Sequence, residues 1–417
     1  MKKTLFALFG TILLSALLCV VLSSCSVLGG GDTVTLYVYN WGEYISDGSE
    51  DSLDVNAAFE EYCREELGLN VVVNYSTFSS NEDMYAKISS GSANYDVIVP
   101  SDYMIQRMVA EDLLAPLDLS LIPNYAHVAP QFKGENVYYE DDDPTTTYSV
   151  PYFYGMIGII HNTSIVAEDD TELGSWALMW DEDYRGDILQ FNNSRDAFGT
   201  ALYYLGYDVN EATEAQWREA LEKLKVQKDV VQGYVMDEIF NKMKSGSAAV
   251  AAYYAGDYLT MYEDNNDLSF FYPREGTNFY MDAMCIPKSS KNFELASHYI
   301  NFMCSEEIAV ANAEYTYYAS PLTTVIENEE YREYMAEVHP DAMEILYGEM
   351  ASSVPSQAYL NLSPERLSML NGLWEELKVE SSIGVGIYVW CGVILASLIL
   401  LGIYQLLKKR RWAKLYD

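Results

Sequence analysis

The turn that ends the first predicted strand brings together an indole, a carboxylate and a phenol. In the segment TLYVYNWGEYI, residues 35–45, an apolar and aromatic run leads to Trp41, Glu43 and Tyr44. The face of an aromatic ring attracts a cation, and a carboxylate accepts the cation's hydrogen bonds. These residues therefore indicate a site for a cationic ligand. On these residues alone, a buried strand that ends in an ordinary loop is the alternative interpretation.

The elements around this turn alternate regularly. The pattern predicts strands at 34–40, 70–75 and 95–100, with helices at 55–67 and 81–89 that Gly68 and Gly91 terminate. This order implies a parallel sheet covered on both faces by helices. Ligands of such sheets bind beyond the carboxyl ends of the strands. The segments 39–44 and 100–103 are both strand ends of that kind.

The later segments repeat this style. Thr213 and Gln216 form a capping box that opens a helix running to about residue 227. Strands are predicted at 248–254 and 280–287, a helix at 292–303, and a final helix begins at Ser363-Pro364. About 350 residues lie between the two hydrophobic ends of the chain, which suits two domains.

The N-terminus has the pattern of an export signal. Lys2 and Lys3 precede an apolar run over residues 5–22, and the run closes on Leu22-Ser23-Ser24-Cys25, which resembles a bacterial lipobox. We expect a signal peptide at 1–24, lipid on Cys25 and a flexible linker over the rest of 25–31. An ordinary signal peptide or an uncleaved anchor is the alternative.

The C-terminus reads as a membrane span. Residues 383–407 carry no charge and are enough for a helix of roughly 37 Å. Lys408, Lys409, Arg410 and Arg411 follow at once, and positive residues stay in the cytoplasm. The prediction is a single-pass helix at 383–407, a cytoplasmic tail at 408–417, and a lipid-anchored receptor on the outer face of the bacterial membrane.

The part between these ends is strongly acidic, with 61 acidic and 18 basic residues and a net charge of about −43. Such a field repels nucleic acid and anionic substrates and concentrates small cations. A plain solvated surface would have the same composition, so the charge alone does not identify a ligand. We expect no nucleic-acid partner.

Catalytic and metal-binding patterns are absent from the sequence. There is no nucleophile elbow, phosphate loop, dinucleotide fingerprint or zinc-protease motif, and the four histidines lack metal-ligand spacing. The cysteines form no regular framework; Cys63 falls on an apolar helical stripe, and a bridge between Cys285 and Cys304 is possible but not indicated. We expect no enzyme activity, no cofactor and no metal.

Six segments in order resemble the landmarks of one family. They are YVYNWGEYI, SNEDMYAKI, YDVIVPSDY, SVPYFYG, SWALMWDEDYRGDIL and FYMDAMCIP. The chain resembles bacterial spermidine/putrescine-binding proteins, the extracytoplasmic receptors of polyamine ABC importers, from about Val34 to Lys378. The resemblance implies an α/β fold, the two-lobed periplasmic-binding-protein fold with crossover hinge strands. It implies lobe 1 at 32–156 and 282–326, and lobe 2 at 157–281 and 327–380.

The resemblance also implies the ligand contacts. Carried over residue by residue, they fall on Trp41, Glu43, Tyr44, Ser101, Tyr103, Asn193, Asp196, Tyr254, Asp257, Tyr280, Asp282 and Tyr318. Asn193 stands where the family has an acid, which puts a preference for longer or more highly charged ligands in doubt. Tyr254 takes the place of a tryptophan. One glutamine contact has no counterpart, because Leu360 aligns there.

The predicted function is a receptor that captures putrescine or spermidine between its lobes and delivers it to the permease of an ABC importer. Aromatic walls would bury the methylenes, and carboxylates would pair the ammonium groups. A receptor for another cationic or metal ligand is the first alternative. A surface enzyme or adhesion module on the same fold is the second.

Overall fold

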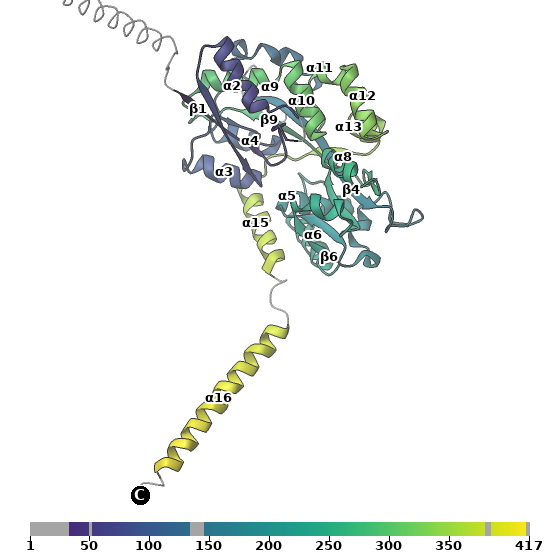
Figure 1. The fold of residues 1–417 in the computed structure, drawn as a ribbon. Coiled ribbons are helices and arrows are strands. Elements are labelled where there is room, and N and C mark those ends of the chain that lie inside the picture. The colour runs from purple at the N-terminus through teal and green to yellow at the C-terminus, as the bar shows by residue number, and fades with distance from the viewer. Residues whose placement is uncertain (1–32, 50–51, 134–145, 380–384, 414–417) are drawn as a thin grey trace, which may run out of the picture.

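A computed structural model describes residues 33–49, 52–133, 146–379 and 385–413 of the chain. The predicted signal peptide, Cys25, the linker 26–31 and the first residues of the predicted membrane span lie outside the described residues. The elements of the described part are arranged as two α/β halves (Figure 1).

The first half begins with the parallel sheet that the sequence predicts. Strand β1 (Val34–Trp41) pairs in parallel with β2 (Val71–Phe78) on one side and with β3 (Val97–Ile98) on the other. Helices α2 (Val55–Glu66), α3 (Asn81–Ser89) and α4 (Asp102–Ala110) connect and cover these strands. The predicted stripe of α2 is confirmed, because Val55, Phe59 and Cys63 are fully buried in the core.

Two long strands cross between the halves. The first part of β4 (Ser149–Asn162) pairs with β9 (Thr277–Cys285), and its second part pairs with β7 (Val250–Tyr254) and β8 (Leu268–Phe271). The strand order is therefore β2-β1-β3-β9-β4-β7-β5-β6, with β10 (Ser356–Ala358) beside β9. A strand that belongs to two sheets in turn links the two halves through their backbone.

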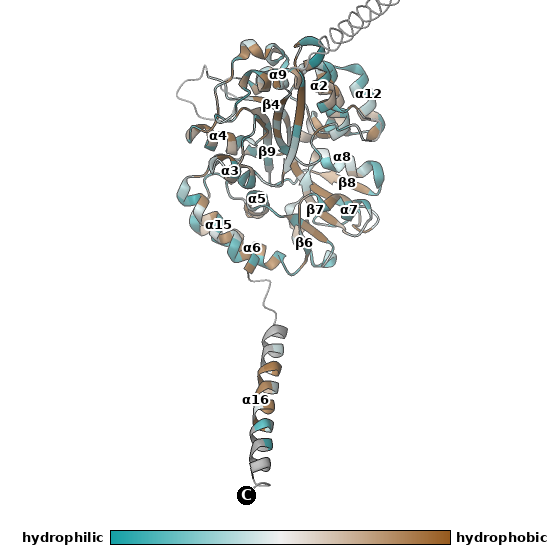
Figure 2. Cartoon of the chain, turned by 60° about the vertical axis from the view of Figure 1, so that its left-hand side comes forward, coloured by the Kyte–Doolittle hydropathy of each residue, from teal (hydrophilic) through white to brown (hydrophobic). Residues whose placement is uncertain are grey.

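The second half is a smaller sheet with its own helices. Strand β5 (Ile188–Phe191) pairs in parallel with β6 (Val231–Val235) and β7. Around them lie α5 (Ser194–Tyr204), α6 (Glu214–Gln227), α7 (Glu238–Lys244) and α8 (Ala255–Asp264). The predicted capping box is present at the start of α6, where the Thr213 and Gln216 side chains each bond the other's backbone. Figure 2 shows apolar strands between helices that are polar on the outside.

The remaining helices attach to one half or the other. They are α9 (Phe293–Met303), α10 (Glu306–Thr316), α11 (Thr323–Ile326), α12 (Glu329–Val338), α13 (Ala342–Leu346), α14 (Glu349–Ser352) and α15 (Pro364–Val379). Short 3-10 turns lie at Leu119–Leu121, Pro123–His127, Pro130–Phe132, Trp176–Trp180 and Glu182–Tyr184. Helix α12 packs on α10 and α11, whereas α15 packs on α5 and α6. The lobe limits inferred from the sequence stay predictions.

Several predicted elements differ from the structure at their ends. The strand predicted at 95–100 is reduced to Val97–Ile98, and the strand predicted at 280–287 begins at Thr277 and ends at Cys285. Strand β2 extends to Phe78 and places that ring against Trp41, with ring centroids 4.5 Å apart. The Cys285 and Cys304 thiols are unpaired, so the bridge left open by the sequence does not form.

The C-terminal segment is helical as α16 (Val385–Ala413). Most of the large apolar side chains described in it, Leu395 and Leu400 among them, are more than half exposed. Among the residues that the structure describes, however, no helix offers an apolar stretch of the length needed to cross a membrane. The predicted span at 383–407 is thus not supported by the structure, and the predicted tail begins inside the helix rather than after it.

Candidate ligand-binding site

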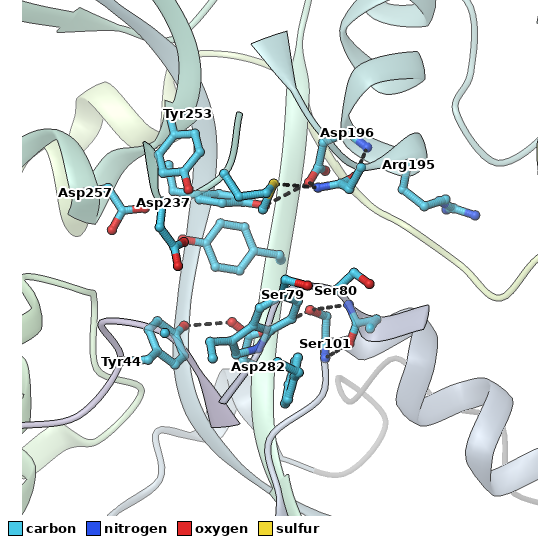
Figure 3. Close-up of a pocket in the computed structure, with 18 of the residues that line it drawn as sticks. Tyr44, Ser79, Ser80, Ser101, Arg195, Asp196, Asp237, Tyr253, Asp257 and Asp282 are labelled. Atoms are coloured by element: carbon cyan, nitrogen blue, oxygen red, sulfur yellow. Dashed lines mark hydrogen bonds between the residues drawn. The ribbon is translucent and has the colours of Figure 1, made fainter. Parts of the chain in front are cut away.

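A pocket lies where the two halves meet, and strand ends and helix starts of both halves line it (Figure 3). All twelve site residues predicted from the sequence are in its lining. The pocket encloses about 880 Å³, open space at its mouth included. The structure thus brings together residues that are up to 277 positions apart in the chain, from Trp41 to Tyr318.

The wall from the first half is built around Asp282. This carboxylate accepts a hydrogen bond from the Ser101 hydroxyl at 2.6 Å and another from the Tyr44 hydroxyl at 2.7 Å. Its side chain is 5% exposed. Burial raises the pKa of Asp282 to about 6, while the two donors oppose that rise because they favour the charged form. A charged carboxylate is therefore already held in position by two neutral donors.

The start of α3 fixes one of these two donors, Ser101. The Asn81 amide accepts from the Ser101 backbone N–H at 3.1 Å and donates to the Ser101 hydroxyl at 3.0 Å and the Tyr103 hydroxyl at 3.1 Å. The Tyr103 hydroxyl in turn donates to Glu82 at 3.1 Å. Asn81 thus orients Ser101, the residue that holds Asp282.

The wall from the second half carries Asp196 in the first turn of α5. Its backbone N–H donates to the Asn193 side chain at 2.8 Å, so Asn193 is the N-cap of that helix. The Asp196 carboxylate accepts from the Asn193 amide at 2.6 Å and from the Tyr254 hydroxyl at 2.8 Å. Burial raises the pKa of Asp196, and these donors act against it. The Asn193 amide gives a hydrogen bond where an acid would add charge.

The second acid of this wall, Asp257, lies in the first turn of α8. It accepts one hydrogen bond from the Tyr318 hydroxyl at 2.8 Å and is 6% exposed. Burial raises the pKa of Asp257 to about 8, and the single donor offsets less of that rise. Near neutral pH the empty site therefore holds this carboxyl mostly protonated.

Aromatic rings close the space between the acids. The rings of Tyr254 and Tyr280 lie edge to face with centroids 5.2 Å apart. A side chain at Gly155 would begin 2.6 Å from the Tyr280 hydroxyl, so the glycine leaves room for that ring. The Tyr280 hydroxyl and the Trp41 indole nitrogen are buried without a hydrogen-bond partner among the described residues. These two polar atoms of the lining thus have no hydrogen-bond partner among the described residues.

The charges of the lining are strongly unequal. Among the described residues, seven carboxyl groups line the pocket, from Glu43, Glu82, Asp102, Asp196, Asp237, Asp257 and Asp282, against one basic side chain, Arg195. That guanidinium stacks on the rings of Tyr103 and Tyr359 at 5.0 and 4.5 Å and donates to the Leu360 carbonyl at 3.2 Å. Such a pocket stabilises a ligand that carries positive charge.

Some lining residues were not predicted as ligand contacts. Glu82 and Arg195 fall within or beside segments that the sequence singles out, and Tyr359 is the neighbour of the unmatched Leu360. Asp237 had no signal, because nothing in the sequence shows that the start of α7 faces the first half. The described residues contain no group of three side chains placed to hold a metal ion.

Comparisons with known proteins agree with this geometry. The family model for bacterial extracellular solute-binding proteins matches residues 57–337. The spermidine/putrescine-binding periplasmic protein of Salmonella typhimurium is 30% identical over 337 residues, 79% of this chain and 90% of that protein. The putrescine/cadaverine-binding protein of Pseudomonas aeruginosa is 28% identical over 281 residues, 64% of this chain and 74% of that protein.

Solved structures give the same picture. A protein described as belonging to a spermidine/putrescine ABC transporter of Listeria monocytogenes superposes with a TM-score of 0.72 at 36% identity, over 82% of this chain and 98% of that one. The spermidine/putrescine ABC transporter substrate-binding protein of Streptococcus pneumoniae gives 0.64 at 31% identity, over 83% and 99%. The two-lobed arrangement predicted from the sequence is confirmed.

Proposed function

The chain belongs to the bacterial extracellular solute-binding proteins, and from this premise we propose that it captures polyamines such as putrescine and spermidine for an ABC importer. Members of this family bind solutes and catalyse no reaction. One observation carries the choice of ligand: seven carboxyl groups and a set of aromatic rings line the pocket, against one arginine that the described chain itself engages. A flexible dication or trication is the ligand class that these walls complement.

The chemistry of a polyamine matches the two kinds of lining. Its methylenes bury against Trp41, Tyr254 and Tyr280, and each methylene removed from water stabilises the complex by about 0.8 kcal/mol. Its ammonium groups pair Asp282 on one wall and Asp257 or Asp196 on the other. Because an unpaired charge in a closed pocket is strongly unfavourable, the placement of the acids selects the spacing of the amines.

Capture requires the two lobes to close around the ligand. We place the hinges where the crossover strands change partners, near 154–158 and 278–282, with a third near 325–327. The change of partner of β4 from β9 to β7 after Met156 supports the first of these. Closure would then present both lobes together to a permease.

Calorimetric titration of the purified full chain tests the proposal. Putrescine, spermidine and spermine are titrated, with cadaverine, lysine, glutamate and Ca²⁺ as comparison ligands. We expect one polyamine per chain with micromolar or tighter affinity, and no heat from glutamate. If lysine or Ca²⁺ binds more tightly than every polyamine, the ligand belongs to that other class. If no amine binds, the proposal is wrong.

Attachment to the membrane is a separate proposal that rests on the sequence. Lipid on Cys25 and the apolar segment 383–407 would hold the receptor at both ends, on the outer face, close to its permease. The test is a Cys25→Ala variant with and without deletion of residues 383–417. The single change should leave the protein in the membrane fraction, and the combined change should release it. Release by Cys25→Ala alone would show that the C-terminal segment is no anchor.

A further inference from the structure

Asp237 is a carboxylate of the pocket that no predicted contact includes. It directly precedes α7 in the second half and lines the central pocket together with Glu43 and Asp257. The same three residues also line a neighbouring outer cavity, whose other ionisable groups are Glu263, Glu314, Lys244 and three tyrosines. Lys244 is engaged by Asp264 at 2.7 Å. Asp237 therefore stands where the central pocket opens into an acidic space.

The carboxylate of Asp237 reaches across to the first half. A Cβ added at Gly42 would lie 2.9 Å from its Oδ2 atom, so the absence of a side chain at Gly42 permits this approach. Figure 3 shows Asp237 and Asp257 on the upper side of the pocket, with Tyr44 and Asp282 below them. The contact joins two residues that lie on opposite walls.

Nothing in the described part of the chain explains Asp237 as a structural residue. Its side chain makes no capping hydrogen bond to α7 and has no hydrogen bond or ion pair with another described residue. Partial loss of water and the neighbouring Glu238 both disfavour its charged form and raise its pKa. Asp237 is nevertheless an exposed residue of the empty protein, so its carboxylate has no protein partner to give up when it pairs a cation at the mouth of the pocket.

The two ends of the pocket differ in charge. At one end Arg195 lies beside Asp196, and its positive charge also acts on Glu82 and Asp102 there. Asp237, Asp257 and Glu43 gather at the other end, next to the outer cavity. A third ammonium at the first end would meet Arg195 as well as acids, whereas at the other end of the pocket the ionisable lining residues are acids alone.

We propose that Asp237 is a specificity-determining residue, which pairs the outer ammonium of a triamine at the mouth of the pocket. This inference rests on the proposed function. A diamine ends between Asp282 and the acids of the second half and does not need Asp237. A triamine places its additional ammonium between Asp237 and Glu43, so the ligand lies with its longer part directed toward the outer cavity.

The experiment compares spermidine with putrescine in calorimetric titrations of the full chain. Asp237→Asn should lower the affinity for spermidine by about fivefold to tenfold, as expected for a partly exposed charge pair. It should lower the affinity for putrescine by less than about twofold. Asp237→Glu should restore most of the spermidine affinity. Glu333→Gln is the matched control, because it removes one charge from an exposed position of α12 outside both cavities.

A second variant approaches the same contact from the opposite wall. Gly42→Ala should displace the Asp237 carboxylate and lower the affinity for spermidine more than the affinity for putrescine. In the double variant with Asp237→Asn the two effects should not add. Equal weakening of both ligands by Asp237→Asn, or unchanged spermidine affinity, overturns the inference while the polyamine function stands. If the wild-type chain binds neither ligand, the proposed function is wrong, and the inference about Asp237 is wrong as well.

Discussion

Two buried carboxylates on opposite walls of the pocket, Asp282 and Asp257, are held in different ways. Asp282, on the first wall, receives hydrogen bonds from Tyr44 and Ser101, and its pKa is about 6. Asp257, on the second wall, receives one from Tyr318, and its pKa is about 8. Both acids are almost fully buried. Asp257 has one donor fewer and lies near the charges of Asp237 and Glu43, and both differences favour its protonated form before the ligand arrives.

This difference assigns the walls different parts in binding. The first wall offers a charge that is already in place, and it attracts the cation to a defined position. On the second wall, Asp257 becomes charged when an ammonium compensates the loss of water. A ligand without positive charge leaves Asp257 protonated and gains nothing from it. We infer that the pocket selects for charge at Asp257 and for position at Asp282.

Removal of the charge at the first wall should have the largest effect. Asp282→Asn keeps the shape of the side chain but leaves an ammonium poorly compensated in the closed pocket. We expect putrescine and spermidine affinities to fall about a hundredfold, or about 2–3 kcal/mol. Titration calorimetry against Glu333→Gln measures the loss. Unchanged affinity would show that Asp282 is no ligand contact and that the first wall does not position the cation.

The aromatic part of the first wall should contribute less. Trp41→Ala removes the ring that covers the methylenes, and we expect a loss of about 1.5–2 kcal/mol, or roughly twentyfold. Trp41 is partly buried at the end of β1 and packs on Phe78, so the variant should still fold. Ligand-dependent tryptophan fluorescence checks the assignment: the signal should change in the wild type and shrink in the variant. No change in either protein would place the aromatic contacts elsewhere.

Removal of a hydrogen-bond donor to Asp282 or Asp257 tests how the donors affect the pKa of each acid. Tyr44→Phe leaves Asp282 with one donor, as Asp257 has, and should raise the pKa of Asp282 above 6. Because a hydrogen bond to a charged group is lost, the affinity for putrescine should fall by about tenfold at pH 7, more at pH 6 and less at pH 8. Tyr318→Phe is the counterpart for Asp257, because it removes the one donor of that carboxyl. A loss by Tyr44→Phe that does not depend on pH would contradict the donor count as the cause.

Much of the fold could be predicted from local pattern. The parallel strands β1 and β2, helix α3 and the capping box of α6 each depend on a few neighbouring residues, and the structure contains them. The strand predicted at 95–100 was wrong in length: β3 covers only Val97–Ile98, although the backbone N–H groups of Asp96 and Val99 still donate to carbonyls of β1. Element ends depend on such tertiary bonds.

The site was predicted through resemblance, residue by residue, and the twelve positions converge on one pocket. Their ligand contacts stay predictions. What the sequence could not show is geometry across the lobes. Nothing local places the Asp237 carboxylate against Gly42, or Arg195 between Tyr103 and Tyr359, since these partners are 92 to 195 positions apart and meet only when both halves are folded.

The proton count of binding tests the difference between the walls most directly. At pH 7 a carboxyl with a pKa of about 8 is protonated in roughly nine of ten molecules, and one with a pKa of about 6 in roughly one of ten. An ammonium lowers both values, so the pocket must release protons as it binds, and affinity must weaken as the pH falls below 8.

Titration of the full chain with putrescine at pH 7, in buffers of different ionisation enthalpy, gives this number. We predict release of about one proton per ligand, falling toward zero in Asp257→Asn and staying near one in the Glu333→Gln control. Binding with no proton release in the wild type would contradict the proposed difference between the walls, because Asp257 would then be either charged in the empty pocket or untouched by the ligand.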